Sequence, residues 1–176
     1  MELTDIIPMS ELTRIVEEIH DKFGFTGVFY KPDNFILVRS KEMGNKLCPF
    51  IKDNHNSLMI CSVAQQILGK DSFDSKEVIV DECDAEMVKF VIPIFVNDEF
   101  LGTVGGCGRL ADDKDSVETF YISKLTGKDE GEIKELAKSI TKVSKDEMKE
   151  IISFVQDSIN PYINKYIEAT KEMKKN

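Results

Sequence analysis

The stretch that decides the fold is FVIPIFVNDEFLGTVGGCGRL, at residues 90–110. Its first half has the apolar, β-branched and aromatic composition of a buried strand, and the Asn-Asp pair at 97–98 is typical of a turn. A second strand follows and ends in the glycine-rich run GGCG at 105–108. The stretch therefore predicts a β-hairpin whose second strand loses most of its side chains beside one thiol.

The glycine run has two readings. Alternate side chains of a strand share a face, so Gly105 and Cys107 lie on the same side. Glycine inside a strand costs roughly 0.5–1 kcal/mol relative to alanine, but it lets a ligand or another backbone come close. The run predicts either a cavity floored by Gly105 beside Cys107, or a bulge or close helix packing. Pro93 cannot donate to a ladder, which predicts a sheet edge or a bulge there.

Composition limits the function classes. The chain has 176 residues, which predicts one domain, and a net charge of -9, which argues against direct binding of nucleic acid or of an anionic membrane surface. No apolar run approaches the ~20 residues that span a bilayer. The first residues lack the features of a signal peptide, so we expect a cytoplasmic protein. In that compartment the four cysteines are expected to be free thiols or ligands.

Hydrophobic periodicity and turn residues place the other elements. They predict helices from Ser10 to Gly24, from Asn54 to Gly69, at 116–125 and at 129–140, and strands at 26–31, 34–40 and 76–82. The hairpin-sized gaps exclude a doubly wound parallel sheet. We therefore expect an α+β fold with a central, mostly antiparallel five-stranded sheet, helices on one side and a long C-terminal helix.

The C-terminal helix forms its own segment. Ser144 and Glu147 make a capping box, and apolar residues follow at alternating spacings of four and three. Pro161 predicts a kink or break. The apolar stripe either pairs two copies as a homodimer or packs on the sheet. We therefore divide the chain into a main domain at 1–143 and a C-terminal helix at 144–176, a candidate for dimerisation or signalling.

Several stretches resemble the PocR sensory domain, a PAS-like ligand-binding module of signalling proteins. They are ELTRIVEEIHDKFGFTGVFYKPD at 11–33, KLCPFIK at 46–52, Cys61, and DECDAEMVKFVIPIFVNDEFLGTVGGCGRL at 81–110. The resemblance implies a PAS/GAF-like fold and the sensing of a small organic molecule, such as a diol or hydrocarbon derivative. It also implies an output domain or a signalling partner protein. The family often has a glutamine where this chain has Cys107, so the ligands of relatives do not transfer.

The PAS-like arrangement brings the cysteines toward one pocket. The predicted ligand-binding residues are Phe29, Phe35, Cys48, Phe50, Cys61, Cys83, Phe90, Gly105 and Cys107. Four thiols around one cavity would suit zinc, copper(I), an iron–sulfur cluster or haem, which makes Cys48, Cys61, Cys83 and Cys107 candidate metal ligands. The alternatives are plain core or pocket lining and a redox switch. His20 and His55 are weaker candidates for an axial ligand.

Motifs of enzyme active sites are absent from the sequence. The run GTVGGCG lacks the glycine spacing of a dinucleotide-binding fingerprint, and neither a phosphate-binding loop nor a nucleophile elbow occurs. We therefore expect a sensor that binds a small ligand without chemistry and that shifts its last helix in response. The alternative is a metal, haem or redox sensor that uses the thiolates.

Overall fold

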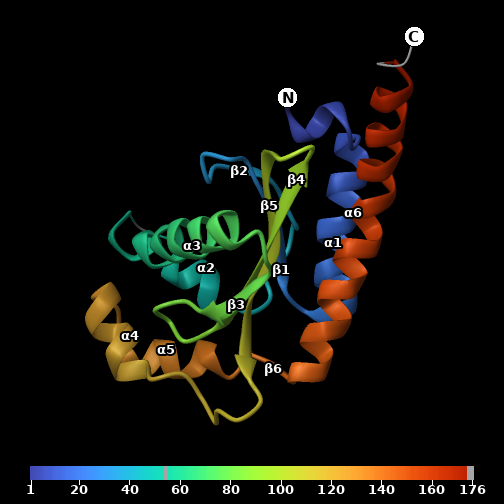
Figure 1. Cartoon of the computed structure of the whole chain (residues 1–176). Coiled ribbons are helices and arrows are strands. Elements are labelled where there is room, and N and C mark those ends of the chain that lie inside the picture. Colours follow the sequence, from blue (N-terminus) through green and yellow to red (C-terminus); the bar gives the residue numbers. More distant parts are fainter. Residues whose placement is uncertain (54, 174–176) are drawn as a thin grey trace.

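The central element is an antiparallel sheet with the strand order β2-β1-β5-β4-β3 (Figure 1). The computed structural model describes residues 1–53 and 55–173. The strands are β1 (Thr26–Tyr30), β2 (Ile36–Arg39), β3 (Ile79–Glu82), β4 (Val88–Val96) and β5 (Glu99–Ala111). A short strand β6 (Lys142–Val143), which the sequence did not predict, pairs in parallel with β5. The predicted α+β fold with five antiparallel strands is confirmed.

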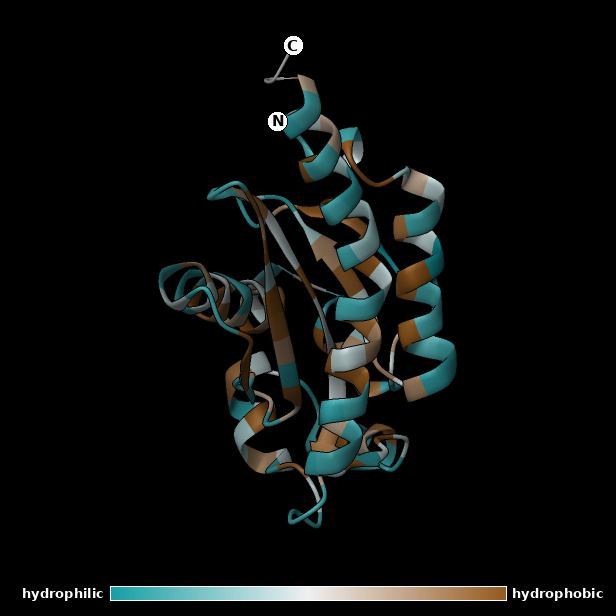
Figure 2. Ribbon diagram, turned by 45° about the vertical axis from the view of Figure 1, so that its right-hand side comes forward, coloured by the Kyte–Doolittle hydropathy of each residue, from teal (hydrophilic) through white to brown (hydrophobic). Residues whose placement is uncertain are grey.

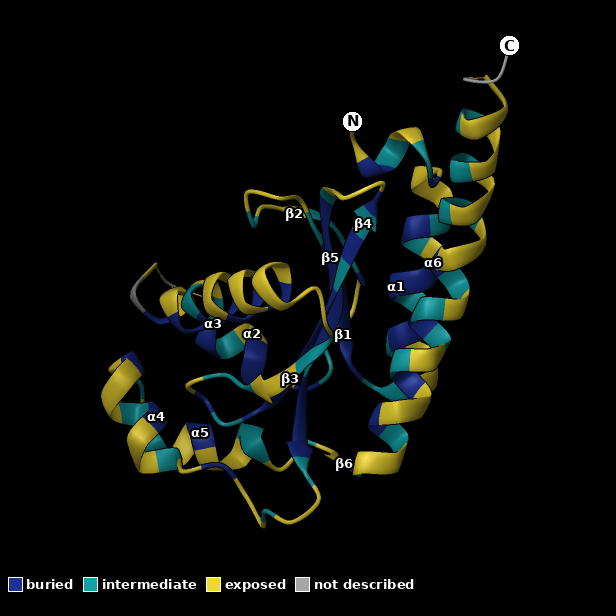
Figure 3. Cartoon of the chain, in the orientation of Figure 1, coloured by how far each residue is buried: buried dark blue, intermediate teal, exposed yellow. Residues whose placement is uncertain are grey.

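Helices cover both faces of the sheet, so the expectation of helices on one side is wrong. One face carries α1 (Met9–Phe23) and α6 (Lys145–Met173), and the other carries α2 (Leu47–Ile51) and α3 (His55–Ser75), with α4 (Thr119–Thr126) and α5 (Glu130–Ala137) beside them (Figures 1 and 3). The reason is that the strands are apolar on both sides. Two separate clusters of buried side chains result, one on each face.

The β4–β5 hairpin has an open edge where the sequence predicted one. Strand β3 pairs with β4 only from Val88 to Val91. Pro93 lies beyond this ladder and is paired with Thr103 of β5 on its other side. The missing N–H of the proline therefore interrupts no hydrogen bond to β3. The predicted edge position of Pro93 is confirmed.

The glycines of β5 serve strand packing. A Cβ on Gly105 would lie 2.0 Å from the Phe90 carbonyl oxygen, and a Cβ on Gly106 would lie 2.8 Å from the Phe90 ring. Gly108 has a φ of +108° and is an extra residue, because Lys89 faces Cys107 while Val88 already faces Arg109. This bulge reverses the alternation, so that Cys107 and Arg109 lie on opposite faces although they are two residues apart.

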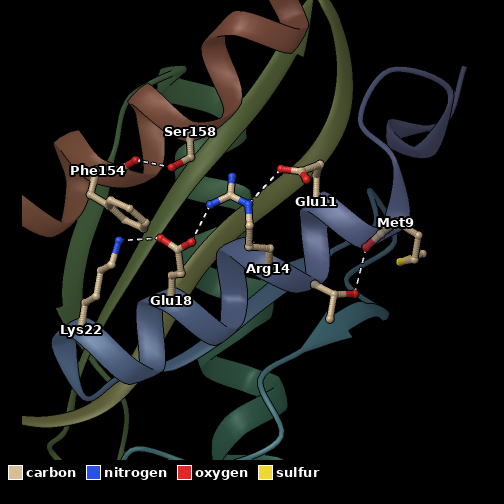
Figure 4. A network of polar contacts seen from close by, with 8 residues as sticks. Met9, Glu11, Arg14, Glu18, Lys22, Phe154 and Ser158 are labelled. Carbon is tan, nitrogen blue, oxygen red and sulfur yellow. Dashed lines mark hydrogen bonds and ion pairs between the residues drawn. The ribbon is translucent and has the colours of Figure 1, made fainter.

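Helices α1 and α6 lie side by side along the sheet, and both show alternating hydrophobic and hydrophilic bands (Figures 1 and 2). Charged side chains on α1 form a row of ion pairs next to the contact between α1 and α6. In this row Arg14 contacts Glu11 at 2.9 Å and Glu18 at 2.6 Å (Figure 4). Lys22 contacts Glu18 and lies 4.8 Å from the centre of the Phe154 ring of α6. These exposed pairs cover the apolar contact and add little stability of their own.

Helix ends differ from the sequence predictions at several places, with Thr119–Thr126 found for 116–125 and Glu130–Ala137 for 129–140. Helix α1 begins at Met9 after Pro8 and ends at Gly24 as expected, with a left-handed φ of 69° at the glycine. The predicted start of the second long helix, Asn54, lies outside the described residues. Helix α3 does not end at Gly69 but continues to Ser75. The glycine serves close packing instead, because a Cβ there would lie 2.8 Å from Asn34 Oδ1.

Helix α6 begins with the predicted capping box. Ser144 N–H donates to Glu147 Oε2 at 3.0 Å, and Glu147 N–H donates to Ser144 Oγ at 3.1 Å. The helix continues past Pro161 to Met173 without ending. Its buried residues, among them Val155 and Ile159, join the core under α1. In the described part of the chain, no helix is long and apolar enough to cross a membrane.

Candidate functional site

A small cavity lies between the sheet and helices α2 and α3. Its volume is about 30 Å³, and all four cysteines line it. The other lining residues are Tyr30, Ile51, Lys52, Ile60, Ala64, Ala85, Met87, Lys89 and Gly108. Chain segments far apart in the sequence thus bring the four thiols to one place.

The strands supply the floor of the cavity. Tyr30 ends β1, and Cys107 of β5 stands opposite Lys89 of β4 in the ladder. The bulge at Gly108 fixes this register, because it adds one residue directly after Cys107. Helix α2 supplies Cys48 and Lys52 at its end, and helix α3 supplies Cys61.

Asn45 organises the inner end of the cavity. Its Nδ2 donates to the Gly108 carbonyl at 2.6 Å and contacts the sulfur of Met87 at 3.2 Å and that of Cys48 at 3.4 Å. Its Oδ1 accepts the backbone N–H of Cys48 at 2.8 Å. One buried amide therefore ties the bulge of β5 to the start of α2, and it holds the Cys48 thiol against Met87.

Burial keeps three of the thiols, those of Cys48, Cys61 and Cys83, protonated. It raises the pKa of Cys83 to about 11, and it also raises the pKa values of Cys48 and Cys61. The same desolvation raises the pKa of the Tyr30 phenol. At neutral pH these groups are uncharged, so the thiols act as weakly polar, polarisable wall elements rather than as thiolates.

Two lysines bring positive charge to this apolar site. Lys89 is only 5% exposed, and its Nζ lies 5.2 Å from the centre of the Tyr30 ring. Burial by itself lowers the pKa of Lys52, but the charges that Cys107, Cys61 and Cys48 acquire on ionisation outweigh this effect, and the pKa is raised. Neither lysine makes an ion pair with the described residues.

A wide groove adjoins the cavity and shares Tyr30, Lys52 and Cys61 with it. The groove has a volume of about 820 Å³. Gln65 lies along it, buried, and its Nε2 donates to Thr103 and to Asn34 at 3.3 Å, while its Oε1 has no hydrogen-bond partner among the described residues. The other lining residues are Asp33, Phe35, Ile36, Arg39, Met43, Pro49, Leu58, Ser62 and Gln66.

Comparison with known families identifies the chain. The family model described as the sensory domain found in PocR matches residues 5–166, which is nearly the whole chain. The chain belongs to the PocR sensory domain family. The resemblance read from the motifs is thereby confirmed, and a sensory role follows for this PocR domain. No curated protein and no solved structure matches the chain.

The predicted ligand-binding residues are divided between several places. The PocR domain brings Cys48, Cys61, Cys83 and Cys107 together around the cavity. Phe35 lines the adjoining groove, where its side chain is 70% exposed. Phe50 packs beside the buried cluster on the α2 side, with Lys128 Nζ 4.1 Å from its ring centre.

The remaining three predicted residues lie away from the cavity. Phe29 and Phe90 are fully buried in the core on the α1 and α6 face. Gly105 lies against the β4 backbone rather than at the cavity floor. For the two phenylalanines the physical reason is strand alternation, because their neighbours Tyr30 and Lys89 are the residues that face the cavity.

The cysteines share the cavity without forming a metal-binding group. Among the described residues of the PocR domain, no three His, Cys, Asp or Glu side chains are placed to hold one metal ion. Burial also raises the pKa values of three of the thiols, which disfavours their ionised form. Zinc, haem or cluster binding through these thiols stays a prediction.

Sequence reasoning missed the lysines of the PocR domain. Lys89 gave a usable signal, because it is a lone charge inside the apolar strand Val88–Val96. A charged residue in such a strand is rarely buried without a purpose. Lys52 gave no comparable signal, since it follows a short helix whose place in the fold depends on long-range packing.

Proposed function

We propose that this PocR domain binds a small organic ligand in the cysteine-lined cavity and the adjoining groove, and that it performs no chemistry on the ligand. One observation carries the proposal, namely that the small cavity and a much wider groove share Tyr30, Lys52 and Cys61 in their walls. An enclosed recess next to an accessible groove is typical of small-molecule sites.

The chemistry of the walls favours a compact ligand with an apolar part. Ile51, Ile60, Ala64 and Met87 give the cavity apolar sides, and the protonated thiols add weak donors. A diol or another oxygenated hydrocarbon derivative fits this mixture, because its carbon atoms contact the walls while its oxygen atoms meet the few polar groups.

Arg109 connects strand β5, which lines the cavity, to the start of helix α6. It lies two residues after Cys107, on the opposite face of β5, and its Nη1 donates to the Phe23 carbonyl at 2.9 Å and to Glu147 Oε1 at 3.2 Å. Its Nη2 donates to the Lys142 carbonyl. A ligand that moves Cys107 would therefore move the group that anchors the start of α6. The output would pass to a partner protein, to an attached domain or to a second copy of the chain.

Native mass spectrometry of the purified domain tests the proposal. We expect a co-purified small molecule, or the capture of one from a metabolite extract, with loss of the bound mass in Cys61→Leu, which fills the junction of cavity and groove. Met59→Leu is the matched control, because Met59 lies on the exposed side of the same helix and is 54% exposed. Binding that persists in Cys61→Leu would contradict the proposed site.

An absorption spectrum and elemental analysis of the same sample, purified without oxygen, test the alternative. We expect no haem or cluster bands and less than stoichiometric zinc. A metal bound in stoichiometric amount, and lost in Cys61→Ala or Cys107→Ala, would instead assign the cavity to a cofactor.

A further inference from the structure

The two lysines that line the cavity, Lys89 and Lys52, lack the counter-charge that a buried lysine normally has. Lys89 is more than nine-tenths buried, yet no carboxylate of the described residues pairs with it or with Lys52. Lys128, whose side chain is only 11% exposed, pairs with Asp53. A buried lysine without a counter-charge is costly, so the retention of Lys89 at a cavity points to a charge that arrives from outside.

The charge distribution around the site agrees with this reading. The chain has a net charge of -9, but the residues that line the cavity include two lysines and no carboxylate. The adjoining groove adds Arg39, which has no ion pair with the described residues, and its one carboxylate belongs to the exposed Asp33. Positive charge is thus concentrated at this cavity and its adjoining groove, although the chain as a whole is acidic.

The size of the cavity selects the kind of anion. A water-sized group needs roughly 10–15 Å³ of such space. The volume of about 30 Å³ therefore accepts about two such groups, which matches the two oxygens of a carboxylate better than the four of a phosphate. The rest of the ligand would lie in the groove, where the side chains of Phe35, Ile36 and Leu58 give apolar contacts.

We infer that the ligand of this domain is a small organic carboxylate, whose charged end is held by Lys89 and Lys52 inside the cavity. The inference rests on the proposed function and names the chemical class of its ligand. It also gives the lysines a purpose that the thiols alone do not provide.

Thermal unfolding with matched pairs of compounds tests the inference. The pairs are lactate with propylene glycol, and hexanoate with hexanol, in potassium salts at constant ionic strength, with inorganic phosphate as a third probe. We expect the carboxylates to raise the melting temperature by roughly 5–10 °C at about a hundred times their Kd, and the alcohols to have a much smaller effect. In Lys89→Met and Lys52→Met the carboxylates should bind about 10- to 100-fold more weakly.

Two controls exclude a merely structural role of the lysines. Lys165→Met removes the same charge from the exposed side of α6 and should leave the carboxylate effect unchanged. Without added ligand, Lys89→Met should unfold at the same or a higher temperature than the unmodified domain, because an unpaired buried charge is removed. A lysine that only supports the fold would give a lower temperature.

The outcomes separate the inference from the proposed function. Equal stabilisation by alcohols and carboxylates, or alcohol binding alone, would overturn the carboxylate assignment and leave the ligand site in place. Stronger stabilisation by phosphate, dependent on Lys89, would overturn it in favour of a phosphate group. If no probe stabilises the domain, the carboxylate assignment falls, and native mass spectrometry decides the proposed function independently.

Discussion

The two faces of the sheet are built from the same strands but differ in what they contain. On the α1 and α6 face, Phe25 and Phe90 are fully buried and meet edge to face at 5.5 Å. On the α2 and α3 face, strands and helices together line a cavity with four thiols and two lysines. The comparison teaches that one face is packed throughout, whereas the other retains a cavity lined by polar and ionisable side chains.

The largest effect is expected from emptying the packed face. Phe90→Ala removes a ring that contacts Phe25 and lies over Gly106, so the free energy of unfolding should fall by about 3–5 kcal/mol in urea denaturation. Phe35→Ala is the control on the other face, where the side chain is 70% exposed, and should change stability by less than about 0.5 kcal/mol. Similar losses in both variants would show that the two faces are not divided in this way.

The thiols of the cavity face should react slowly. Burial raises the pKa of Cys83 from 9.0 to about 11, so its thiolate fraction at neutral pH falls about 100-fold. Alkylation of Cys83 by iodoacetamide, followed by mass spectrometry, should be slower by at least that factor in the native than in the urea-unfolded protein. The native rate should increase with pH up to about 11. Equal native and unfolded rates would mean that the thiol is solvated.

The raised pKa of Cys83 also predicts how the free energy of unfolding changes at high pH. A thiol whose pKa is raised by folding retains its proton in the native state after the unfolded chain has lost it. The free energy of unfolding should therefore fall as the pH rises from 9.0 to about 11. A Cys83→Ala variant should show a shallower decrease over that range.

A smaller effect is expected at the bulge that separates the two faces. Gly108→Ala places a side chain at a φ of +108°, which should cost about 1–3 kcal/mol of stability. Gly131→Ala in helix α5, where φ is not positive, should change stability by less than about 1 kcal/mol. A neutral Gly108→Ala would show that β5 passes the cavity without the bulge described above.

The smallest effect is expected at the helix anchor. The Ser144 backbone N–H, and then the Arg109 charge, hold the pKa of Glu147 below its usual 4.5 in spite of partial burial. This contribution is present above pH 4.5 and is lost as the pH falls through the lowered pKa. Because the side chain is 46% exposed, solvent screening limits the effect to about 1 kcal/mol at most. Glu147→Gln should flatten the acid limb of the stability profile, whereas the exposed Glu150→Gln should leave it unchanged.

Local signals predicted much of this fold. Gly24 ends α1, Pro93 marks a sheet edge, and Ser144 with Glu147 caps α6, because each residue acts on backbone groups close to it in sequence. The gathering of the cysteines came from the family resemblance rather than from spacing. The family model confirms the family, while ligand binding at these residues stays a prediction.

Other features could not be predicted, because they depend on which helices pack on each face of a strand. Strand β4 is apolar on both sides, so its pattern could not show that Phe90 enters the core while Lys89 faces the cavity. That choice depends on the register with β5 and on helices α1 and α6, which pack on the far face from both ends of the chain. The end of α3 was predicted wrongly for a related reason. Gly69 allows close packing against Asn34, which is distant in sequence, and does not end the helix.

The alternation along β5 has an evolutionary consequence. Val104 and Gly106 serve the core, whereas Thr103 and Cys107 face the α3 side and can change without disturbing it. Under the function proposed above, substitutions at Thr103 and Cys107 would change the ligand preference of a family member at little cost in stability. A one-residue deletion at Gly108 would instead exchange the faces of every later residue of the strand. Relatives are therefore expected to diversify through point substitutions near the cavity, and to conserve the length of this strand.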